Sequence, residues 1–313
     1  MKELLLAKSK SFTTVGNIQS LVTIIGNLSA AAFSALSIIL LSRKMGPELF
    51  GEFSTAFALI LILNKLNDVG LSLTTQKLLS TSLTNKNEVS KLSSELLLAR
   101  VLLSVVILVI FLPLSPLLTR ALQISNPYLL PASVLFGTAM VYFEYLIATL
   151  QGIHRFYQAV FVNIFQGIGK LLLAIVYTFT SINFLSTFIL YVTIPVFPLL
   201  FSSKLTPEWF NPFSLNFKQK ISKEIFSITR HTSIMILAGA VIQNIGILFT
   251  KGYLNSFDAG ILGGISRIAL LFSIIGISLT QVLYPRVSRY KNKSDVKKFI
   301  NKSLLLVLGA VLG

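Results

Sequence analysis

The sequence predicts an all-α polytopic membrane protein, and three observations lead to that prediction. Hydrophobic residues make up 54% of the 313 residues and charged residues only 12%. Soluble globular proteins carry about 25% charged residues, so this chain has too few charges to cover a surface that faces water. Its apolar runs are also long enough to cross a hydrocarbon layer, which takes roughly 20 residues of helix. The alternating ten-residue segments typical of an outer-membrane barrel do not occur.

Eight complete membrane spans are expected from the apolar runs. In chain order they lie near 19–41, 52–76, 92–118, 127–150, 158–180, 182–202, 226–250 and 259–283. A ninth run begins near 300 and reaches Gly313, which is too short to cross. The first six spans predict an N-terminal six-helix bundle over residues 1–205, and residues 206–313 predict the beginning of a second, truncated bundle.

The basic residues predict the orientation of the chain. The N-terminal tail and the even-numbered loops hold 19 Lys and Arg, and the odd-numbered loops hold 4. Cytoplasmic loops carry the excess of Lys and Arg, so the N-terminus is expected in the cytoplasm and the protein in the inner membrane. This distribution also accounts for the net charge of +16 without a nucleic-acid partner.

The composition leaves little room for an enzyme. The chain has no Cys and two His, so a thiol mechanism, a disulfide and a metal site are not expected, and no cofactor is predicted. No carboxylate pair or Ser–His pair lies in a loop, and we therefore name no catalytic residue.

The longest cytoplasmic loop contains a short aromatic pattern. Trp209, Phe213 and Phe217 recur at a spacing of four and precede the basic stretch from Lys218 to Lys223. Such a segment is typical of a helix that lies among lipid headgroups. It is equally compatible with an ordinary linker that carries aromatic anchors, and the sequence does not decide between the two.

An internal repeat is the next feature. The segments Met45–Gly51 and Leu254–Gly260 are both short outer loops that end in Gly and precede an apolar run, and they are 209 residues apart. Six spans separate them, so the repeat is parallel, with its axis along the membrane normal. The full unit would then have roughly 420 residues and twelve or so helices around a central cavity, and this chain would be a truncated product or a fragment.

Six ionisable residues fall inside the spans: Lys65, Asp68, Arg100, Glu144, Lys170 and Arg267. Such residues are expensive in a membrane and usually face a cavity or a partner. Lys65 and Asp68 are three residues apart and could pair with each other. Arg100 lies near the cytoplasmic end of its span, where its side chain is expected to reach the interface. Glu144 could pair with Lys170 or Arg267, or carry a coupling proton.

Polar residues form stripes at helical spacing on nearly every span, which predicts an aqueous cavity between the helices. The three cations Lys65, Lys170 and Arg267 are the candidate substrate-binding residues. Cavity cations outnumber cavity acids, which favours an anionic substrate such as a phosphate. The candidate polar or ion-coupling residues of this cavity are Asn27, Asn64, Asp68, Glu144, Asn163, Gln166 and Asn244.

Four segments, in this order, resemble those of a known family. They are Leu41–Phe53, the run Asp68-Val-Gly-Leu71, the run Leu150–Phe156, and Gly260–Arg267 with the following Tyr284-Pro285. Together they resemble the polysaccharide (O-antigen, Wzx-type) flippases of the multidrug/oligosaccharidyl-lipid/polysaccharide exporter superfamily, over essentially the whole chain.

The resemblance implies two six-helix bundles that work by alternating access. It implies a substrate of polyprenyl-pyrophosphate-linked oligosaccharide, flipped across the cytoplasmic membrane for surface polysaccharide or lipopolysaccharide synthesis and coupled to an ion gradient. Membrane lipid and the polysaccharide polymerase machinery are the implied partners. By position, Lys65 and Arg267 match the cations that hold the pyrophosphate in relatives. The chain departs from the family where its C-terminal helices are missing, and at Gln243-Asn244, where relatives commonly have an acid.

Two other functions stay open. A multidrug efflux transporter of the same superfamily would favour acidic and aromatic cavity residues that bind organic cations. A membrane enzyme such as a polysaccharide polymerase would need a catalytic group in a loop, and the loops of this chain offer none.

Overall fold

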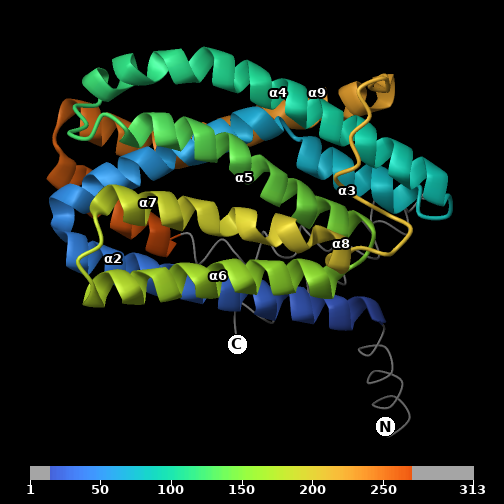
Figure 1. The fold of residues 1–313 in the computed structure, drawn as a ribbon, viewed down its shortest axis with the longest axis horizontal. Helices are drawn as coiled ribbons and strands as arrows, with labels where there is room; N and C mark the ends of the chain where they lie inside the picture. The colour runs from blue at the N-terminus through green and yellow to red at the C-terminus, as the bar shows by residue number, and fades with distance from the viewer. Residues whose placement is uncertain (1–14, 270–313) are drawn as a thin grey trace, which may run out of the picture.

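The computed structural model describes residues 15–269, and these form a bundle of long helices that run side by side (Figure 1). The helices of this part of the chain are α2 (Val15–Asp68), α3 (Leu71–Thr81), α4 (Lys86–Ala121), α5 (Leu129–Gly152), α6 (Phe156–Phe179), α7 (Phe184–Thr193), the 3-10 helix η1 (Ile194–Phe201), α8 (Ser202–Leu205) and α9 (Lys223–Tyr253). A further helix begins at residue 256 and is described as far as residue 269.

Six helical segments of the described chain are long and apolar enough to cross a membrane: Val22–Asp68, Lys86–Ala121, Leu129–Gly152, Phe156–Phe179, Phe184–Leu205 and Lys223–Tyr253. Because α2 contains two predicted spans, these segments confirm the first seven spans of the sequence analysis. The eighth is described only at its beginning, and the ninth lies outside the described residues.

The segment predicted as the first outer loop is a kink inside α2 rather than a loop. Gly46 has φ 72° and ψ 167°, which interrupts the helix, and Pro47 follows immediately. Glycine adopts a positive φ without a steric penalty, and proline is favoured at the first position of a helix. The chain therefore reverses across the membrane with a single residue outside helical geometry.

The second predicted span, 52–76, is not one continuous helix. Val69 has φ 38° and Gly70 has φ 92°, so α2 ends at Asp68 and α3 begins at Leu71. Asp68 replaces the lost helical bonds, because its carboxylate accepts the backbone N–H groups of Gly70 at 3.2 Å and Ser72 at 3.0 Å. A side-chain oxygen at a helix start satisfies donors that have no partner in the helix.

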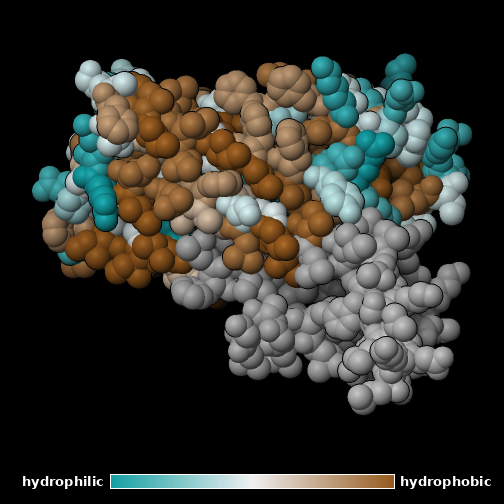
Figure 2. All heavy atoms as spheres, turned by 90° about the horizontal axis from the view of Figure 1, so that it is seen from below, coloured by the Kyte–Doolittle hydropathy of each residue, from teal (hydrophilic) through white to brown (hydrophobic). Residues whose placement is uncertain are grey.

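The surface of the described residues fits a membrane. Figure 2 shows hydrophilic residues gathered toward the two ends of the long axis, with a wide hydrophobic band between them. Large apolar side chains on α4 contribute to the exposed surface, among them Leu102, Val106 and Val109, which is 68% exposed. Exposed apolar residues at this density are expected where lipid replaces water as the solvent.

The linker between α8 and α9 contains turns and no helix over residues 206–222. The interfacial helix that the aromatic spacing allowed is therefore wrong, and the ordinary linker is confirmed. Phe210 is buried, and the carbonyl oxygen of Pro212 accepts a hydrogen bond from the Tyr145 hydroxyl at 2.8 Å. These contacts attach the linker to the ends of α4 and α5.

The predicted repeat has a physical counterpart at the end of the bundle that contains Gly46. The break at Gly46 and the restart at Pro47 recur in the gap after α9 and the restart at residue 256. A Cβ atom on Gly51 would overlap the carbonyl oxygen of Ser256, and one on Gly260 would overlap that of Pro47. Both pairs are related by the same offset of 209 residues, as expected when two equivalent helices cross on a pseudo-twofold axis.

Candidate functional site

A cavity of about 820 Å³ lies between α2, α3, α5 and α6 on one side and α9 on the other. It therefore lies between the first group of helices and the first helix of the second predicted bundle. Its polar lining is formed by Lys65, Asp68, Ser72, Gln76, Glu144, Gln151, Asn163, Gln243 and Asn244. Five of the ten residues named as candidates in the sequence thus share one cavity: Lys65, Asp68, Glu144, Asn163 and Asn244.

The pair formed by Lys65 and Glu144 is the main electrostatic contact in this cavity. The Nζ atom of Lys65 lies 2.7 Å and 2.6 Å from the two carboxylate oxygens of Glu144. Both side chains are partly open to the cavity, at 34% and 26% exposure. Asn64 is fully buried behind them, and with its amide nitrogen turned toward Glu144 it donates to both carboxylate oxygens, at 3.0 Å and 3.2 Å.

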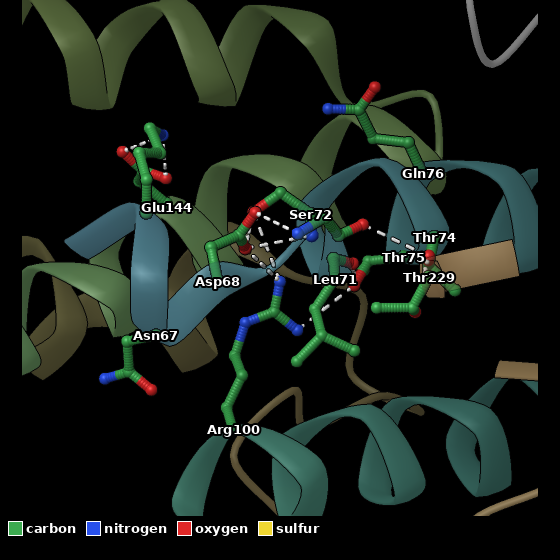
Figure 3. Close-up of polar contacts among 12 residues, drawn as sticks. Asn67, Asp68, Leu71, Ser72, Thr74, Thr75, Gln76, Arg100, Glu144 and Thr229 are labelled. Atoms are coloured by element: carbon green, nitrogen blue, oxygen red, sulfur yellow. Dashed lines mark hydrogen bonds and ion pairs between the residues drawn. The ribbon is translucent and has the colours of Figure 1, made fainter. Parts of the chain in front are cut away.

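Asp68 pairs with Arg100 and not with Lys65. One Nη atom of Arg100 donates to the Asp68 carboxylate at 3.1 Å and to the Ser72 hydroxyl at 3.2 Å, and the other donates to the Thr75 hydroxyl at 3.3 Å. Figure 3 shows Arg100 reaching from α4 into the break between α2 and α3. Its guanidinium also lies 4.8 Å from the centre of the Tyr145 ring, a cation–π contact.

The expectation that Arg100 reaches the membrane interface is therefore wrong, because its side chain is completely buried. The possible Lys65–Asp68 pair of the sequence analysis also does not form. The physical reason is the same for both: Asp68 is the last residue of α2, and its carboxylate turns toward the start of α3 and toward Arg100.

The remaining polar candidates take different places. The amide of Asn163 donates to the side-chain oxygen of Asn27 at 2.9 Å, which links α6 to the first half of α2 beside the cavity. Asn244 lines the cavity from α9 and donates to the Ala240 carbonyl oxygen at 2.9 Å. Gln166 is half-buried on α6 and is not part of the cavity lining.

Lys170 and Arg267 form a second basic site, away from the cavity lining. The Nζ atom of Lys170 lies 4.9 Å from the ring centre of Tyr191 and 5.8 Å from that of Phe57. The guanidinium carbon of Arg267 lies 4.7 Å from the same Phe57 ring. Phe57 precedes Lys65 by eight residues on α2, which separates the two basic sites by roughly 12 Å along the helix.

Neither cation of this second site has an ion-pair partner among residues 22–269. Lys170 is 4% exposed, and one Nη atom of Arg267 is buried with no hydrogen-bond partner in this part of the chain. Buried cations usually pair with an acid, because desolvation is costly. Aromatic faces return about 0.5–2 kcal/mol per contact, which offsets part of that desolvation cost.

Two parts of these sites were not predicted. Gln76 donates to Gln151 across the cavity at 2.9 Å, and its spacing of four from Ser72 is the sequence signal that could have identified it. The aromatic rings of Phe57 and Tyr191 were also missed. Phe57 follows Phe50 and Phe53 in the same segment, so the sequence carries no signal that separates it from them.

The chain matches one protein family and several solved structures. The family model described as polysaccharide biosynthesis protein matches residues 19–291. No curated protein sequence matches the chain significantly. Among solved structures, a MATE protein in the straight conformation has a TM-score of 0.73 at 15% identity, covering 94% of this chain and 69% of its own.

Two further structures share the fold. The MATE multidrug transporter DinF-BH, solved with a bound ligand, has a TM-score of 0.70 at 16% identity, covering 94% of this chain and 69% of that one. A MOP superfamily transporter from Pyrococcus furiosus, described as having a binding pocket of reverse polarity, has a TM-score of 0.65 at 16% identity, covering 88% and 63%. With the family match extending over most of the chain, this polytopic membrane protein belongs to the polysaccharide biosynthesis protein family and has the fold of the MOP superfamily transporters.

Proposed function

We propose that the protein is a transporter that moves a polyprenyl-pyrophosphate-linked oligosaccharide across the inner membrane. The observation that carries this proposal is the polar cavity of about 820 Å³ between the first helices and α9. A glycan needs a hydrogen-bonding route through the bilayer, and this cavity offers amides, hydroxyls and an ammonium group. The family match to polysaccharide biosynthesis proteins supports the same class of substrate.

The two basic sites give the pyrophosphate two levels at which it can bind. Lys65 lines the cavity, and Lys170 with Arg267 lies about two helical turns beyond it, near Phe57. Phosphate oxygens accept charge-assisted hydrogen bonds from such groups. The sugars would occupy the cavity beside Asn163, Asn244 and the pair of Gln76 and Gln151, while the polyprenyl tail stays in lipid.

The orientation of the chain, its division into two bundles and its partners belong to the same proposal. The N-terminus lies in the cytoplasm, since Lys and Arg gather on the even-numbered loops. Residues 1–205 and 206–313 belong to two bundles that rock against each other to open the cavity to either side. The polysaccharide polymerase machinery would receive the translocated product, and no covalent chemistry by this chain is needed.

The test is flipping of a fluorescent polyprenyl-pyrophosphate oligosaccharide in proteoliposomes that contain the full chain. Lys65→Ala and Arg267→Ala should each lower the initial rate at least tenfold. Arg120→Ala, an exposed Arg at the end of α4, is the matched control and should leave the rate unchanged. Unchanged flipping in both cation variants would reject the site assignment.

A second function has one observation in its favour. The cavity lining also contains the acids Asp68 and Glu144 and the ring of Phe143, which are groups that organic cations bind, and one structure of the same fold is a multidrug transporter. The same vesicles loaded with a cationic rhodamine dye decide this case. Efflux of the dye without flipping of the glycolipid would replace the first function by the second.

A further inference from the structure

In the pair of Lys65 and Glu144, the carboxylate of Glu144 already occupies the lysine as its anion. Both carboxylate oxygens of Glu144 lie within hydrogen-bonding distance of the Lys65 Nζ atom. An ammonium group can donate three hydrogen bonds, and two of them are used by this carboxylate. A phosphate group that enters the cavity therefore meets a lysine whose charge is compensated.

Among residues 22–269, the rest of the cavity does not supply the missing positive charge. The charged groups around Glu144 are Lys65 and Asp68 from α2 and Arg100 from α4, and Arg100 is bound to Asp68. The groups that line the cavity from α6 and α9 are the uncharged Asn163, Gln243 and Asn244. Two cations thus face two acids, and the local charge is zero while Glu144 is ionised.

Glu144 has a second hydrogen-bond partner when its ion pair with Lys65 breaks. With the Asn64 amide oriented to satisfy its hydrogen bonds, its nitrogen donates to both carboxylate oxygens and its oxygen accepts the backbone N–H of Val141 at 3.2 Å. In that orientation loss of the lysine does not leave Glu144 without a partner.

We propose that Glu144 is the specificity-determining residue of the Lys65 site, acting as a tethered competitor of the substrate's phosphate group. A phosphate binds Lys65 only when Glu144 leaves the ammonium group. This inference rests on the proposed function, because it concerns the same anion-binding lysine.

The arrangement predicts the direction in which the affinity for an anion changes. The Glu144 carboxylate and the incoming anion compete for the same ammonium group, so removing the charge of Glu144 should raise the affinity of Lys65 for the anion. If Glu144 only shaped the cavity, its charge would have no such effect.

The experiment measures binding of inorganic pyrophosphate to the purified full chain by isothermal titration calorimetry at pH 8. Glu144→Gln keeps the shape of the side chain and removes its charge, and it should raise the affinity by roughly tenfold, within the range of typical couplings between sites.

Four further variants complete the design. Lys65→Ala should lose at least tenfold in affinity, and adding Glu144→Gln to it should change nothing, because the competition needs both partners. Glu144→Asp keeps the charge on a shorter stem, so it should give a smaller gain in affinity. Glu48→Gln, on the same helix as Lys65 at the outer end, is the matched control and should bind as the native chain does.

The outcomes separate the two proposals. If Lys65→Ala weakens binding while Glu144→Gln and Glu144→Asp leave it unchanged or weaken it, the competitor role is wrong and the anion site stands. If Lys65→Ala binds pyrophosphate as the native chain does, the anion site of the proposed function fails. The Asp variant keeps the test decisive when the Gln variant does not fold.

Discussion

Replacing Arg100 by Leu tests the buried contact that holds the break between α2 and α3. The guanidinium is completely buried and makes one ion pair at 3.1 Å and two hydroxyl contacts at 3.2 Å and 3.3 Å. Removing one partner of a buried ion pair costs about 3–5 kcal/mol, because the other charge remains in the interior. Asp68 retains three hydrogen bonds, from Gly70 and Ser72, so we expect about 3 kcal/mol.

A loss of that size lowers the melting temperature by roughly 6–12 °C in a chain of a few hundred residues. The assay is thermal unfolding of the purified protein in detergent, followed by size-exclusion chromatography of the soluble fraction. Arg100→Leu combined with Asp68→Leu removes both charges and should recover most of the lost stability. Arg120→Leu, at the exposed end of the same helix, should cost under about 1 kcal/mol.

The reasoning would be refuted by a melting temperature for Arg100→Leu within about 3 °C of the native value. A double variant no more stable than the single one would also count against it, since the cost would then come from lost packing and not from the stranded carboxylate.

Two other contacts can be tested directly. The hydroxyls of Thr74 and Thr229 lie 3.0 Å apart, and the native chain has no Cys. Thr74→Cys combined with Thr229→Cys should therefore form one disulfide under mild oxidation. If the intact mass shows no loss of two hydrogens, the packing of α3 on α9 is contradicted. Gly51→Ala should cost more than about 2 kcal/mol in the same unfolding assay, since its methyl group would overlap backbone. Gly239→Ala, where nothing lies within 4 Å, should be neutral or stabilising, and equal effects of the two Gly variants would be inconsistent with the close crossing.

The bundle could be predicted because its signals are local. A run of apolar residues specifies a span whatever the rest of the chain does, and the first seven spans all appear in the structure. The pair Gly46-Pro47 carries its own conformational preference, so the position of the kink could be expected, although its sharpness could not. The break at Val69 was missed, because Val has no preference for a positive φ. Asp68, whose carboxylate supports the break, was instead assigned to the polar face of a continuous helix.

The cavity could be predicted only in part, because its partners come from distant parts of the chain. Helical spacing correctly put polar groups on the inner faces of α2, α5, α6 and α9. Helical spacing could not predict that Lys65 forms its ion pair with Glu144, which is 79 residues away, and not with Asp68 on its own helix. The separation of Lys170 and Arg267 from the cavity also depends on how α6 and α7 are packed around Phe57, which no single segment encodes.

The crossing of Gly51 and Gly260 has a consequence for how the two halves of the molecule can change. Gly51 and Gly260 are separated by the 209-residue offset of the predicted repeat, and each meets the backbone that flanks the other. A larger side chain at one of these glycines would need the backbone beside the other glycine to move away. Neither position can therefore be changed independently of the other. A chimera that joins halves from two relatives would succeed or fail first at these few atoms.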